Sequence, residues 1–451
     1  MNNFLSHQQS LASRYLSPMR DQQLALLLAC ALLALGSCRK DKDDAAPTVH
    51  IYAPFAGSTL AIPGTITISA HVVDDNSVEA VTAELVDANG VPIAPSAQIA
   101  VNSASATVQL EITLNSERIT SGTYTMIVRA TDGENDGRAF VDINVLAAPL
   151  RVRSVFVLPP ISSAPPYAIT RLDSTGTTIA WTSVTELSGS AMDLDHLYIA
   201  GTTAQPLVKM NPNTGASAMV LANDGVPGGS GSFFHGLAVD PSDHRSYIGT
   251  IEGSLRGYSA SGGGVFAATS PTGLYSEMTV VVNDLVVSAA IEPVSGTRTL
   301  VNHAYSSGVV LGQFPLDVVP TALFAHGTDH VFVFGNRNGD GVVQERNVEA
   351  GGVYEMQLFT GDPVRAVAQV NASTYVIALQ SGIIKFTYQN NGISPVSSGT
   401  TADALVYEPA SGSLLVGAVS QLITMDPNTG VVLDTRSMPT EVGSILLLMN
   451  R

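Results

Sequence analysis

The chain has 451 residues, a formal net charge of −17, and 45% hydrophobic but only 13% charged residues. This length exceeds one ordinary domain, so two or more cores are expected. The acidic balance argues against nucleic-acid binding through a basic surface, and the 40 glycines and 24 prolines favour short strands and tight turns over long helices.

Residues 1–37 have the pattern of a lipoprotein signal peptide. The apolar run Leu24–Gly36 follows Arg14 and Arg20, and at 1.5 Å per residue it is too short to cross a bilayer core of ~30 Å. Leu35-Gly36-Ser37-Cys38 resembles a bacterial lipobox, in which small residues precede a cysteine that becomes the lipidated mature N-terminus. Cys38 is therefore the predicted lipidation site, with a plain secretory signal and an incidental cysteine as the alternative.

Residues 38–45 form a charged tether that lacks core-forming residues. The tether resembles that of surface lipoproteins in some Gram-negative bacteria, where acidic residues after the cysteine favour export to the cell exterior. Here Arg39 and Lys40 come first, so the resemblance implies the outer membrane and leaves open the cell surface or the periplasmic side. Cys30 and Cys38 are the only cysteines, so the folded part holds neither a disulfide nor a cysteine-ligated metal.

Residues 46–146 are predicted to form an Ig-like β-sandwich. Residues 65–72, 107–114 and 123–130 alternate apolar and polar side chains with the period of two that a half-buried strand requires. Ala139–Val145 closes the set, and turn residues such as Asp132–Asn135 separate the strands. A span of about 100 residues suits one sandwich.

The segment from Ser121-Gly122-Thr123-Tyr124 to Ala130-Thr131-Asp132-Gly133 resembles bacterial Ig-like and cadherin-like domains, which often carry a GxY…AxD pattern there. The Cys-Trp-Cys core of antibody domains is missing, because both cysteines precede this region and the only tryptophan is Trp181. The resemblance implies a fold and no activity, since such sandwiches serve many functions.

Residues 150–451 contain a repeat. The plainest pair is Met210–Gly215 (MNPNTG) and Met425–Gly430 (MDPNTG), each set between two apolar strands like a hairpin turn that ends in glycine at positive φ. Including weaker versions, the turn glycines recur about every 40 residues, at Gly176, Gly215, Gly262, Gly308, Gly352, Gly392 and Gly430. This interval is near the ~40–45-residue period of a four-stranded propeller blade.

The other half of each repeat is a pair of short strands, most visible in residues 232–254. At the end of the repeat region, 442–449 is a single strand without a partner of its own, whereas the region begins with only three strands. One strand plus three completes a blade and removes the open edge. The sequence therefore predicts an all-β chain in which a seven-bladed propeller follows the sandwich; six or eight blades are the alternatives.

The repeats resemble the broad class of YVTN-type and quinoprotein-like bacterial propellers, through turns such as Asp426–Gly430 (DPNTG) and the strand Gly236–Pro241 (GLAVDP). The resemblance implies a fold and no activity. The Trp-Asp pairs of WD40 repeats are absent. A parallel β-helix is the alternative fold, although its period would be shorter and its hairpin turns fewer.

In a propeller, the residues just before each innermost strand point into the mouth of the central channel. Alignment of the repeats, with Ser188 or Gly189 from the remaining blade, places six residues there: His235, Glu277, Thr321, Arg365, Asp403 and Glu441. Convergent polar groups around one concavity suit ligand binding, so these residues are the candidate site. The alternative is a water-filled channel with satisfied polar walls, and no catalytic residue is assigned because no nucleophile or phosphate-loop motif is present.

Residues 336–341 look like the front half of a calcium-binding loop. Asn336, Asn338 and Asp340 place oxygens at alternate positions, and Gly341 permits a sharp turn. The twelfth position is Asn347, however, where such a loop carries a bidentate glutamate. Calcium is the one cofactor that the sequence suggests, and an ordinary Asn/Gly hairpin loop is the alternative.

Two functions follow from these patterns. The first is a lipid-anchored cell-envelope binding or scaffold protein, attached to the membrane through its N-terminal lipid only, whose propeller presents a surface to a protein or glycan. The second is a propeller enzyme of the lyase, glycan hydrolase or lactonase type. An enzyme should bring His235 within hydrogen-bonding reach of Glu277, Asp403 or Glu441, whereas a scaffold should show apolar patches on a rim. The first is preferred, because no catalytic motif supports the second.

Overall fold

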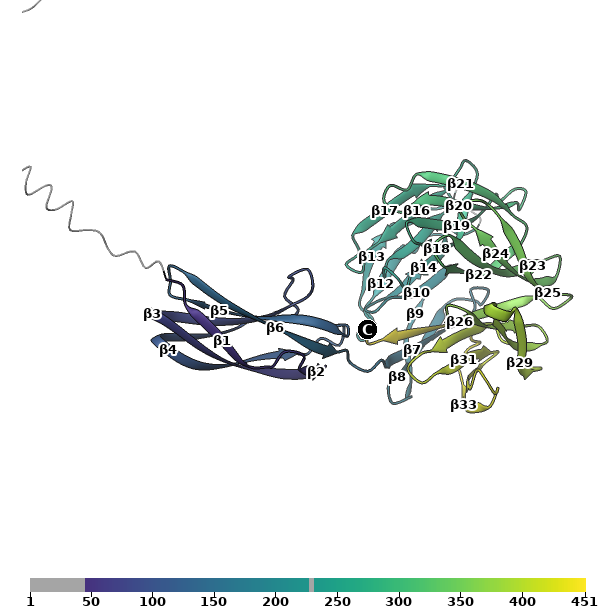
Figure 1. Cartoon of the computed structure of the whole chain (residues 1–451). Helices are drawn as coiled ribbons and strands as arrows, with labels where there is room; N and C mark the ends of the chain where they lie inside the picture. Colours follow the sequence, from purple (N-terminus) through teal and green to yellow (C-terminus); the bar gives the residue numbers. More distant parts are fainter. Residues whose placement is uncertain (1–44, 227–230) are drawn as a thin grey trace, which may run out of the picture. The chain divides into compact units, whose positions relative to one another are not determined.

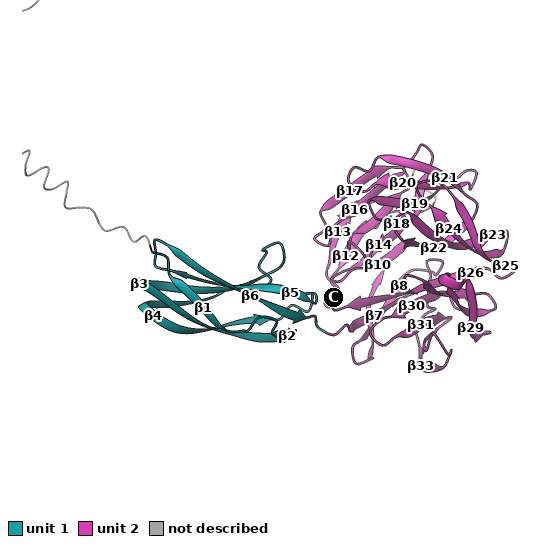
Figure 2. Cartoon of the chain, in the orientation of Figure 1, with its two compact units in different colours: residues 1–148 teal, residues 149–451 magenta. Residues whose placement is uncertain are grey.

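The computed structural model describes residues 45–226 and 231–451, which form strands and turns with one short 3-10 helix, η1 (Tyr388–Asn390). The chain divides into two compact units, one ending at Ala148 and the other beginning at Pro149 (Figure 2). Within the described ranges, no helix is long and apolar enough to cross a membrane. The predicted lipidation site, Cys38, lies outside the described residues.

The first unit has six strands: β1 (Thr48–Ala53), β2 (Thr59–Ala61), β3 (Gly64–Val86), β4 (Ala97–Leu114), β5 (Gly122–Thr131) and β6 (Asp136–Leu146). Their order is β1-β3-β5-β6-β2, with β4 paired to β3. The register of β3 shifts after Val73, so its first half pairs with β1 and its second half with β5. Both halves bury alternate apolar side chains in one core, as the period of two predicts.

A buried tyrosine ties this sandwich together at the start of β5. Tyr124 is 8% exposed, and its hydroxyl donates a hydrogen bond to the backbone carbonyl of Thr120 at 3.0 Å. A tyrosine that bonds back to the backbone a few residues upstream matches the tyrosine corner of Ig-like domains. In the next turn, Asp132 accepts hydrogen bonds from the N–H groups of Glu134 and Asn135, so this carboxylate closes a turn.

The second unit is a propeller of seven four-stranded antiparallel blades (Figure 1). Blade 1 consists of β34 (Ser444–Met449), β7 (Val152–Leu158), β8 (Tyr167–Asp173) and β9 (Thr178–Val184). Blade 2 consists of β10 (Gly189–Met192), β11 (Leu197–Ala200), β12 (Leu207–Met210) and β13 (Ser217–Leu221). Blade 3 consists of β14 (Phe234–Val239), β15 (Ser246–Thr250), β16 (Ser254–Tyr258) and β17 (Gly264–Thr269).

The other four blades keep the same strand order. Blade 4 consists of β18 (Tyr275–Val282), β19 (Leu285–Ile291), β20 (Arg298–Ala304) and β21 (Val310–Leu316). Blade 5 consists of β22 (Val319–His326), β23 (His330–Arg337), β24 (Asp340–Asn347) and β25 (Val353–Phe359). Blade 6 consists of β26 (Val364–Asn371), β27 (Thr374–Leu379), β28 (Gly382–Thr387) and β29 (Gly392–Ser398), and blade 7 of β30 (Ala404–Glu408), β31 (Ser413–Ala418), β32 (Gln421–Met425) and β33 (Val432–Ser437).

The two ends of the propeller meet in blade 1. Strand β34 pairs antiparallel with β7, from Ser444 opposite Leu158 to Met449 opposite Val152, and in Figure 1 the yellow C-terminal strand lies beside β7. Beyond the strand, the Asn450 side chain accepts a hydrogen bond from the Arg151 N–H at 3.0 Å. The predicted seven blades and the closure by the C-terminal strand are confirmed.

The first strands of the blades form a closed inner ring in which consecutive strands contact one another, from β10 through β14, β18, β22, β26, β30 and β34 back to β10. Each of the seven junctions has its own apolar cluster with residues from both neighbouring blades. Burial between two neighbours explains why a second strand such as β19 (LVVSAAI) has buried residues on both faces.

The turn between the third and fourth strands docks each blade onto the preceding one. In blade 7, Gly430 has φ +70°, and a Cβ there would lie 1.8 Å from the carbonyl oxygen of Val396 in blade 6. In blade 4, a Cβ on Gly308 would lie 2.0 Å from the carbonyl oxygen of Ala267 in blade 3. Glycine is thus required both for the positive φ and for the close approach of two backbones.

Two of the seven turn positions differ from the prediction. In blade 5 the left-handed residue is Gly351 and not Gly352, and in blade 6 it is Asn391 and not Gly392. In blade 5 the turn begins at Asn347, whose N–H bonds to the Gly352 carbonyl, so the left-handed position falls one residue earlier. In blade 6 asparagine replaces glycine because it tolerates the left-handed region.

A polar side chain also clamps most of these turns. The clamping residue lies on the third strand of the preceding blade. It is two residues before the first residue of the turn that follows its own strand. The contacts are Arg171 to the Pro212 carbonyl (3.1 Å), Lys209 to the Ser261 carbonyl (2.6 Å), Asn302 to the Val348 carbonyl, the Tyr388 hydroxyl to Glu345 (3.1 Å) and Lys385 to Asn428 (3.0 Å). Two blades lack this clamp. In blade 3 the clamp position is Gly257, which has no side chain. In blade 7 it is Thr424, and Arg436 of β33 donates a hydrogen bond to the Gly176 carbonyl in its place.

Candidate functional site

The predicted channel-mouth residues lie at or before the start of the innermost strands. Glu277 of β18, Thr321 of β22 and Arg365 of β26 share one structural position, since each is the extra residue of a β-bulge. A bulge leaves one residue out of the ladder and changes the direction of its side chain. Asp403 directly precedes β30, and Glu441 lies before β34.

His235 of β14 differs by one residue from this alignment. It pairs with Gly249, and the bulge follows it, with Gly236 and Leu237 opposite Ile248. In blade 4 the paired residue before the bulge is Ser276. His235 is therefore equivalent to Ser276 and not to Glu277, because aligning strands by their apolar residues does not reveal where each bulge begins.

His235 is half-buried at the junction of blades 3 and 4. Its Nε2 lies 2.8 Å from the Ser232 carbonyl oxygen, so Nε2–H donates there and the neutral ring carries its lone pair on Nδ1. The imidazole packs against the ring of Tyr275, with centroids 4.2 Å apart. Burial lowers the pKa of His235, and the Ser232 carbonyl and the charge of Glu277 oppose this effect. The imidazole is therefore neutral at pH 7.

The carboxylate of Glu277 is held by Arg298 at the start of β20. The Arg298 Nε–Oε2 distance is 2.7 Å and the Nη2–Oε1 distance is 3.1 Å, which is a bidentate pair. The side chains are 16% exposed for Arg298 and 26% for Glu277. Burial and the charge of Glu277 raise the pKa of Tyr275. We call His235, Tyr275, Glu277 and Arg298 the His235 cluster.

Arg365 and Asp403 form a second pair, which joins blades 6 and 7. Arg365 donates two hydrogen bonds to Asp403 Oδ1, one of them from Nε at 3.0 Å. Both side chains are exposed, at 39% and 45%, so water and salt screen the pair and it contributes little to stability. This ion pair therefore links blade 6 to blade 7.

The remaining two predicted residues have different surroundings. The Thr321 hydroxyl lies 3.4 Å from the Val364 carbonyl oxygen, and Glu441 is exposed in the segment before β34. Among the described residues, the hydrogen bonds and ion pairs of the six candidates do not join them into one group. The structure brings His235 near Glu277 and Arg365 against Asp403, and in the part of the chain that it describes no hydrogen bond or ion pair joins the side chain of Thr321 or Glu441 to these residues.

The three residues of the calcium candidate lie in or beside the β23–β24 hairpin. Asn338 and Gly339 have φ values of +55° and +90°, as in a two-residue turn. The Asn336 side chain bonds to both the N–H (2.7 Å) and the carbonyl (2.9 Å) of Val364, and Asp340 accepts the Gly361 N–H (2.7 Å). This geometry is that of the alternative, an Asn/Gly hairpin loop. The described residues contain no group of three or more His, Cys, Asp or Glu side chains arranged to hold a metal ion.

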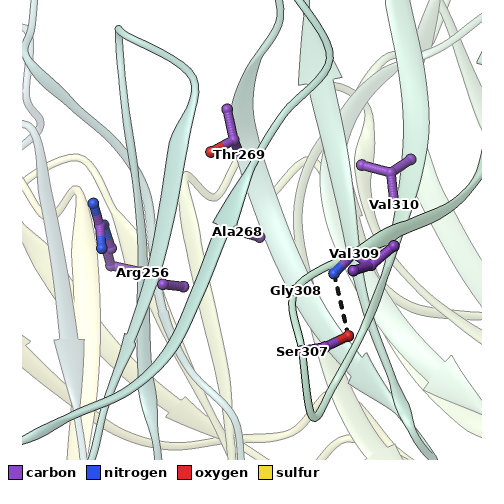
Figure 3. Close-up of a pocket in the computed structure, with 8 residues that line it drawn as sticks. Arg256, Ala268, Thr269, Ser307, Gly308, Val309 and Val310 are labelled. Carbon is purple, nitrogen blue, oxygen red and sulfur yellow. Dashed lines mark hydrogen bonds between the residues drawn. The ribbon is translucent and has the colours of Figure 1, made fainter.

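Hollows open between the blades, among the third and fourth strands and the turns. Two of them, each of about 370 Å³, adjoin β17 at the junction of blades 3 and 4 and share Arg256, Ala267 and Ser307. Figure 3 shows one, with Arg256 on one side, Ser307 on the other, and Ala268 between them. A hollow of about 350 Å³ lies at the junction of blades 7 and 1. The clamp position at these two junctions is Gly257 or Thr424, and smaller hollows also occur where a clamp is present, at Asn302 and at Lys385.

The outermost strands carry exposed apolar side chains around the rim of the propeller. Met219 of β13, Leu311 of β21, Tyr354 of β25 and Leu433 of β33 are 68%, 63%, 59% and 61% exposed. Each lies on the fourth strand of its blade, whose outer edge pairs with no other strand among the described residues. Interaction surfaces gather such groups into contiguous patches, whereas single exposed apolar residues are common on proteins.

Tyr275 and Arg298 of the His235 cluster were missed by the sequence analysis. Arg298 lies on the third strand, and its distance from Glu277 depends on the register of three strands and on a bulge. Tyr275 lies two residues before Glu277, and that spacing was the one available signal that both side chains sit at the same end of β18.

Comparison with known proteins supports the Ig-like fold of the first unit. Residues 47–128 match the family model of a bacterial Ig domain. No curated protein matches the sequence. A solved quinoprotein alcohol dehydrogenase-like protein from Bacteroides thetaiotaomicron is 12% identical with a TM-score of 0.43, over 89% of this chain and 99% of that one. A dihydro-heme d1 dehydrogenase is 10% identical with a TM-score of 0.45, over 72% and 73% of the two chains. At these identities and TM-scores, neither likeness bears on the activity of this chain.

Proposed function

We propose that this chain is a lipid-anchored protein of the bacterial cell envelope that binds a protein or glycan through its propeller. The lipid on Cys38 holds it at the outer membrane, and the Ig-like unit serves as a spacer. The signal-length apolar run and the sequence Leu35-Gly36-Ser37-Cys38 support the anchor. The rim of the propeller, with its exposed apolar residues and its hollows between blades, supports binding.

One observation carries the preference for binding over catalysis. His235 donates its hydrogen bond to a backbone carbonyl, Glu277 is occupied by Arg298, and Asp403 is occupied by Arg365. A general acid or base must reach its substrate or the nucleophile that it activates. Groups already engaged in this way make contacts within a blade or, for Arg365 and Asp403, between two blades, and we assign recognition to the surface of the propeller.

A propeller enzyme of the lyase, glycan hydrolase or lactonase type is the second candidate, and the His235 cluster favours it. Burial keeps the imidazole of His235 neutral beside the carboxylate of Glu277. A neutral histidine in such surroundings suits a general base. Catalysis by this cluster requires a substrate that reaches Nδ1 of His235 and breaks the pairing of Glu277 with Arg298.

The anchor is tested by metabolic labelling of the full chain with a palmitate analogue. We expect label on the wild-type protein, none on Cys38→Ser, and label on Cys30→Ser, which is the matched control. Cell fractionation should place the wild-type protein with the outer membrane and release Cys38→Ser. An unlabelled wild-type protein, or label that depends on Cys30, would contradict the proposed anchor.

Binding is tested with the purified full-length protein and immobilised envelope fractions. We expect saturable binding that excess unlabelled protein displaces. We also expect one of two treatments of the fraction, with protease or with glycosidase, to abolish this binding. The treatment that abolishes it identifies the ligand as protein or glycan. Absence of saturable binding, together with turnover of a glycan or lactone substrate that is lost in His235→Gln, would overturn the proposal in favour of the enzyme.

A further inference from the structure

We propose that the hollow between blades 4 and 5 binds the ammonium group of a lysine side chain on a partner protein. This inference rests on the proposed function as a binding protein, and it names the chemistry that one surface recognises. The hollow has a volume of about 280 Å³. It lies where the turn of blade 5, at Val348 and Glu349, meets strands β19, β20 and β21 of blade 4.

Asn302 of β20 closes the inner end of this hollow with an oxygen that has no partner. The residue is 2% exposed. Its Nδ2 donates a hydrogen bond to the Val348 carbonyl, which fixes the orientation of the amide, since the reverse orientation would place two oxygens against each other. Oδ1 accepts no hydrogen bond in the described structure. A buried acceptor of this kind costs free energy until a donor reaches it.

The strand beside Asn302 leaves space next to the amide. Gly312 of β21 pairs with Asn302, and a Cβ on Gly312 would lie 3.5 Å from Asn302 Nδ2. Glycine thus omits the side chain that would fill this part of the hollow. Leu311 is the extra residue of a β-bulge, which redirects its side chain, and it is 63% exposed. The hollow therefore extends from an apolar rim at Leu311 to the amide at its inner end.

Two carboxylates without a cationic partner line the same hollow. Asp284 and Glu349 are both exposed, and they come from different blades. None of the ion pairs found among the described residues includes either one. Asp284 accepts a long hydrogen bond from the neighbouring Asn283 side chain at 3.3 Å. We expect a ligand here to carry positive charge, because a neutral one would take water from two unpaired carboxylates.

The acceptors of this hollow suit an ammonium group better than a metal ion or a guanidinium. The backbone carbonyls of Asp284 and Val348 already accept hydrogen bonds, so only side-chain oxygens remain, fewer than the roughly six to eight oxygens that calcium takes. An ammonium has three donors, one for each of Asn302 Oδ1, Asp284 and Glu349. A guanidinium has five, so some of them would lose water without gaining a partner. The alkyl stem of a lysine packs against Leu311.

The test compares ligands of equal charge, because a chain of net charge −17 attracts any cation. Ligand-observed NMR measures the binding of the full-length protein to capped peptides Gly-Gly-X-Gly-Gly, in which X is lysine, arginine or Nε-acetyl-lysine. We expect the lysine peptide to bind at least about fivefold more tightly than the arginine peptide. The acetyl-lysine peptide, which lacks the charge, should bind more weakly than either.

Two double variants locate the preference. Asp284→Asn, Glu349→Gln should bind the lysine and arginine peptides equally. Asp75→Asn, Glu111→Gln removes two charges from exposed positions of the Ig-like unit, so it is the matched control and should keep the preference for lysine. All four substitutions change exposed side chains only, and thermal unfolding of both variants shows whether the fold is retained.

Equal affinity of the wild type for the lysine and arginine peptides, or a preference that survives in Asp284→Asn, Glu349→Gln, would overturn the inference. The outcome is separate from that of the proposed function. If the wild type binds envelope fractions saturably and this double variant binds them equally, the inference is wrong and the protein binds its partner through another surface. Weaker binding of the double variant to these fractions, with the control variant unchanged, would support a lysine of the partner as the ligand.

Discussion

The carbonyl oxygen of Val396 in blade 6 occupies the place that a side chain on Gly430 in blade 7 would need, 1.8 Å from an ideal Cβ. The repeated Thr-Gly turn is therefore a docking device between blades as well as a hairpin turn. The sequence motif that reveals the repeat is the same feature that holds the ring together.

Replacing Gly430 by alanine should destabilise the propeller by about 2–4 kcal/mol, because the left-handed φ strains any Cβ and the new atom overlaps Val396. Gly327→Ala is the matched control, since Gly327 has φ +63° but open space around it. Gly327→Ala should lower the free energy of unfolding by only about 1–2 kcal/mol. Urea unfolding followed by the fluorescence of Trp181 in β9, the only tryptophan, reports the propeller alone. Equal losses in the two variants would refute the docking role.

Truncating Leu448 in the closing strand should cost about 2–5 kcal/mol, as is usual for a fully buried leucine. Leu448 is 0% exposed and packs with Phe156 and Leu197 of the first two blades. Leu446→Ala, on the same strand but half-buried, is the control and should lose less. Unfolding of both variants is again followed by the fluorescence of Trp181, because this tryptophan lies in blade 1. A Leu448→Ala protein as stable as the control would mean that β34 does not hold the ring closed.

Two arginine ion pairs should differ in their contribution to stability. Arg346 is 4% exposed and bonds to Asp317, Gln344 and the Pro315 carbonyl. Its removal leaves the Pro315 carbonyl and the Gln344 side-chain oxygen without this donor, while Asp317 keeps Arg337, and Arg346→Ala should cost about 1–3 kcal/mol. Arg365→Ala, which breaks the exposed pair with Asp403, should cost less than about 1 kcal/mol. Chemical denaturation of both variants measures the difference, and a larger loss for Arg365→Ala would contradict the burial argument.

Stability should fall as the pH drops below about 6.5, the ordinary histidine pKa. Burial lowers the pKa values of His303 and His235 in the folded chain, so the unfolded chain binds more protons in this range and gains free energy relative to the fold. His303 is 0% exposed, and its Nε2 lacks a hydrogen-bond partner in the described structure.

The melting temperature of His303→Gln should therefore depend less on pH between 5 and 7 than that of the wild type. His50→Gln, at an exposed histidine of the Ig-like unit, is the control for removal of a histidine. A pH profile identical to that of the wild type in His303→Gln would show that this histidine is not the source of the acid sensitivity.

The fold was predictable because its signals are local. Alternation in 65–72 follows directly from one buried face, and the turns at Gly215 and Gly430 need glycine for geometric reasons that do not depend on the rest of the chain. The count of one strand plus three at the ends predicted how β34 closes blade 1. The alternation and the turns depend on sequence neighbours only, whereas the closure follows from a count of strands along the whole repeat region.

The candidate site was less predictable because its contacts depend on register. The bulge after His235 moves that residue by one position relative to Glu277, and no pattern of apolar residues marks where a bulge begins. The pairing of Glu277 with Arg298 joins residues on the first and third strands of one blade. Only the arrangement of three strands brings them together.

In the proposed function the propeller binds through its surface, and the His235 cluster does not catalyse a reaction. The most direct measurement compares the wild type with the full-length double variant His235→Gln, Glu277→Gln, for saturable binding to envelope fractions and for turnover of glycan and lactone substrates. We expect binding within about twofold of the wild type and no turnover that the variant loses. Loss of both binding and a wild-type turnover in the double variant, with its melting temperature unchanged, would contradict the proposed function.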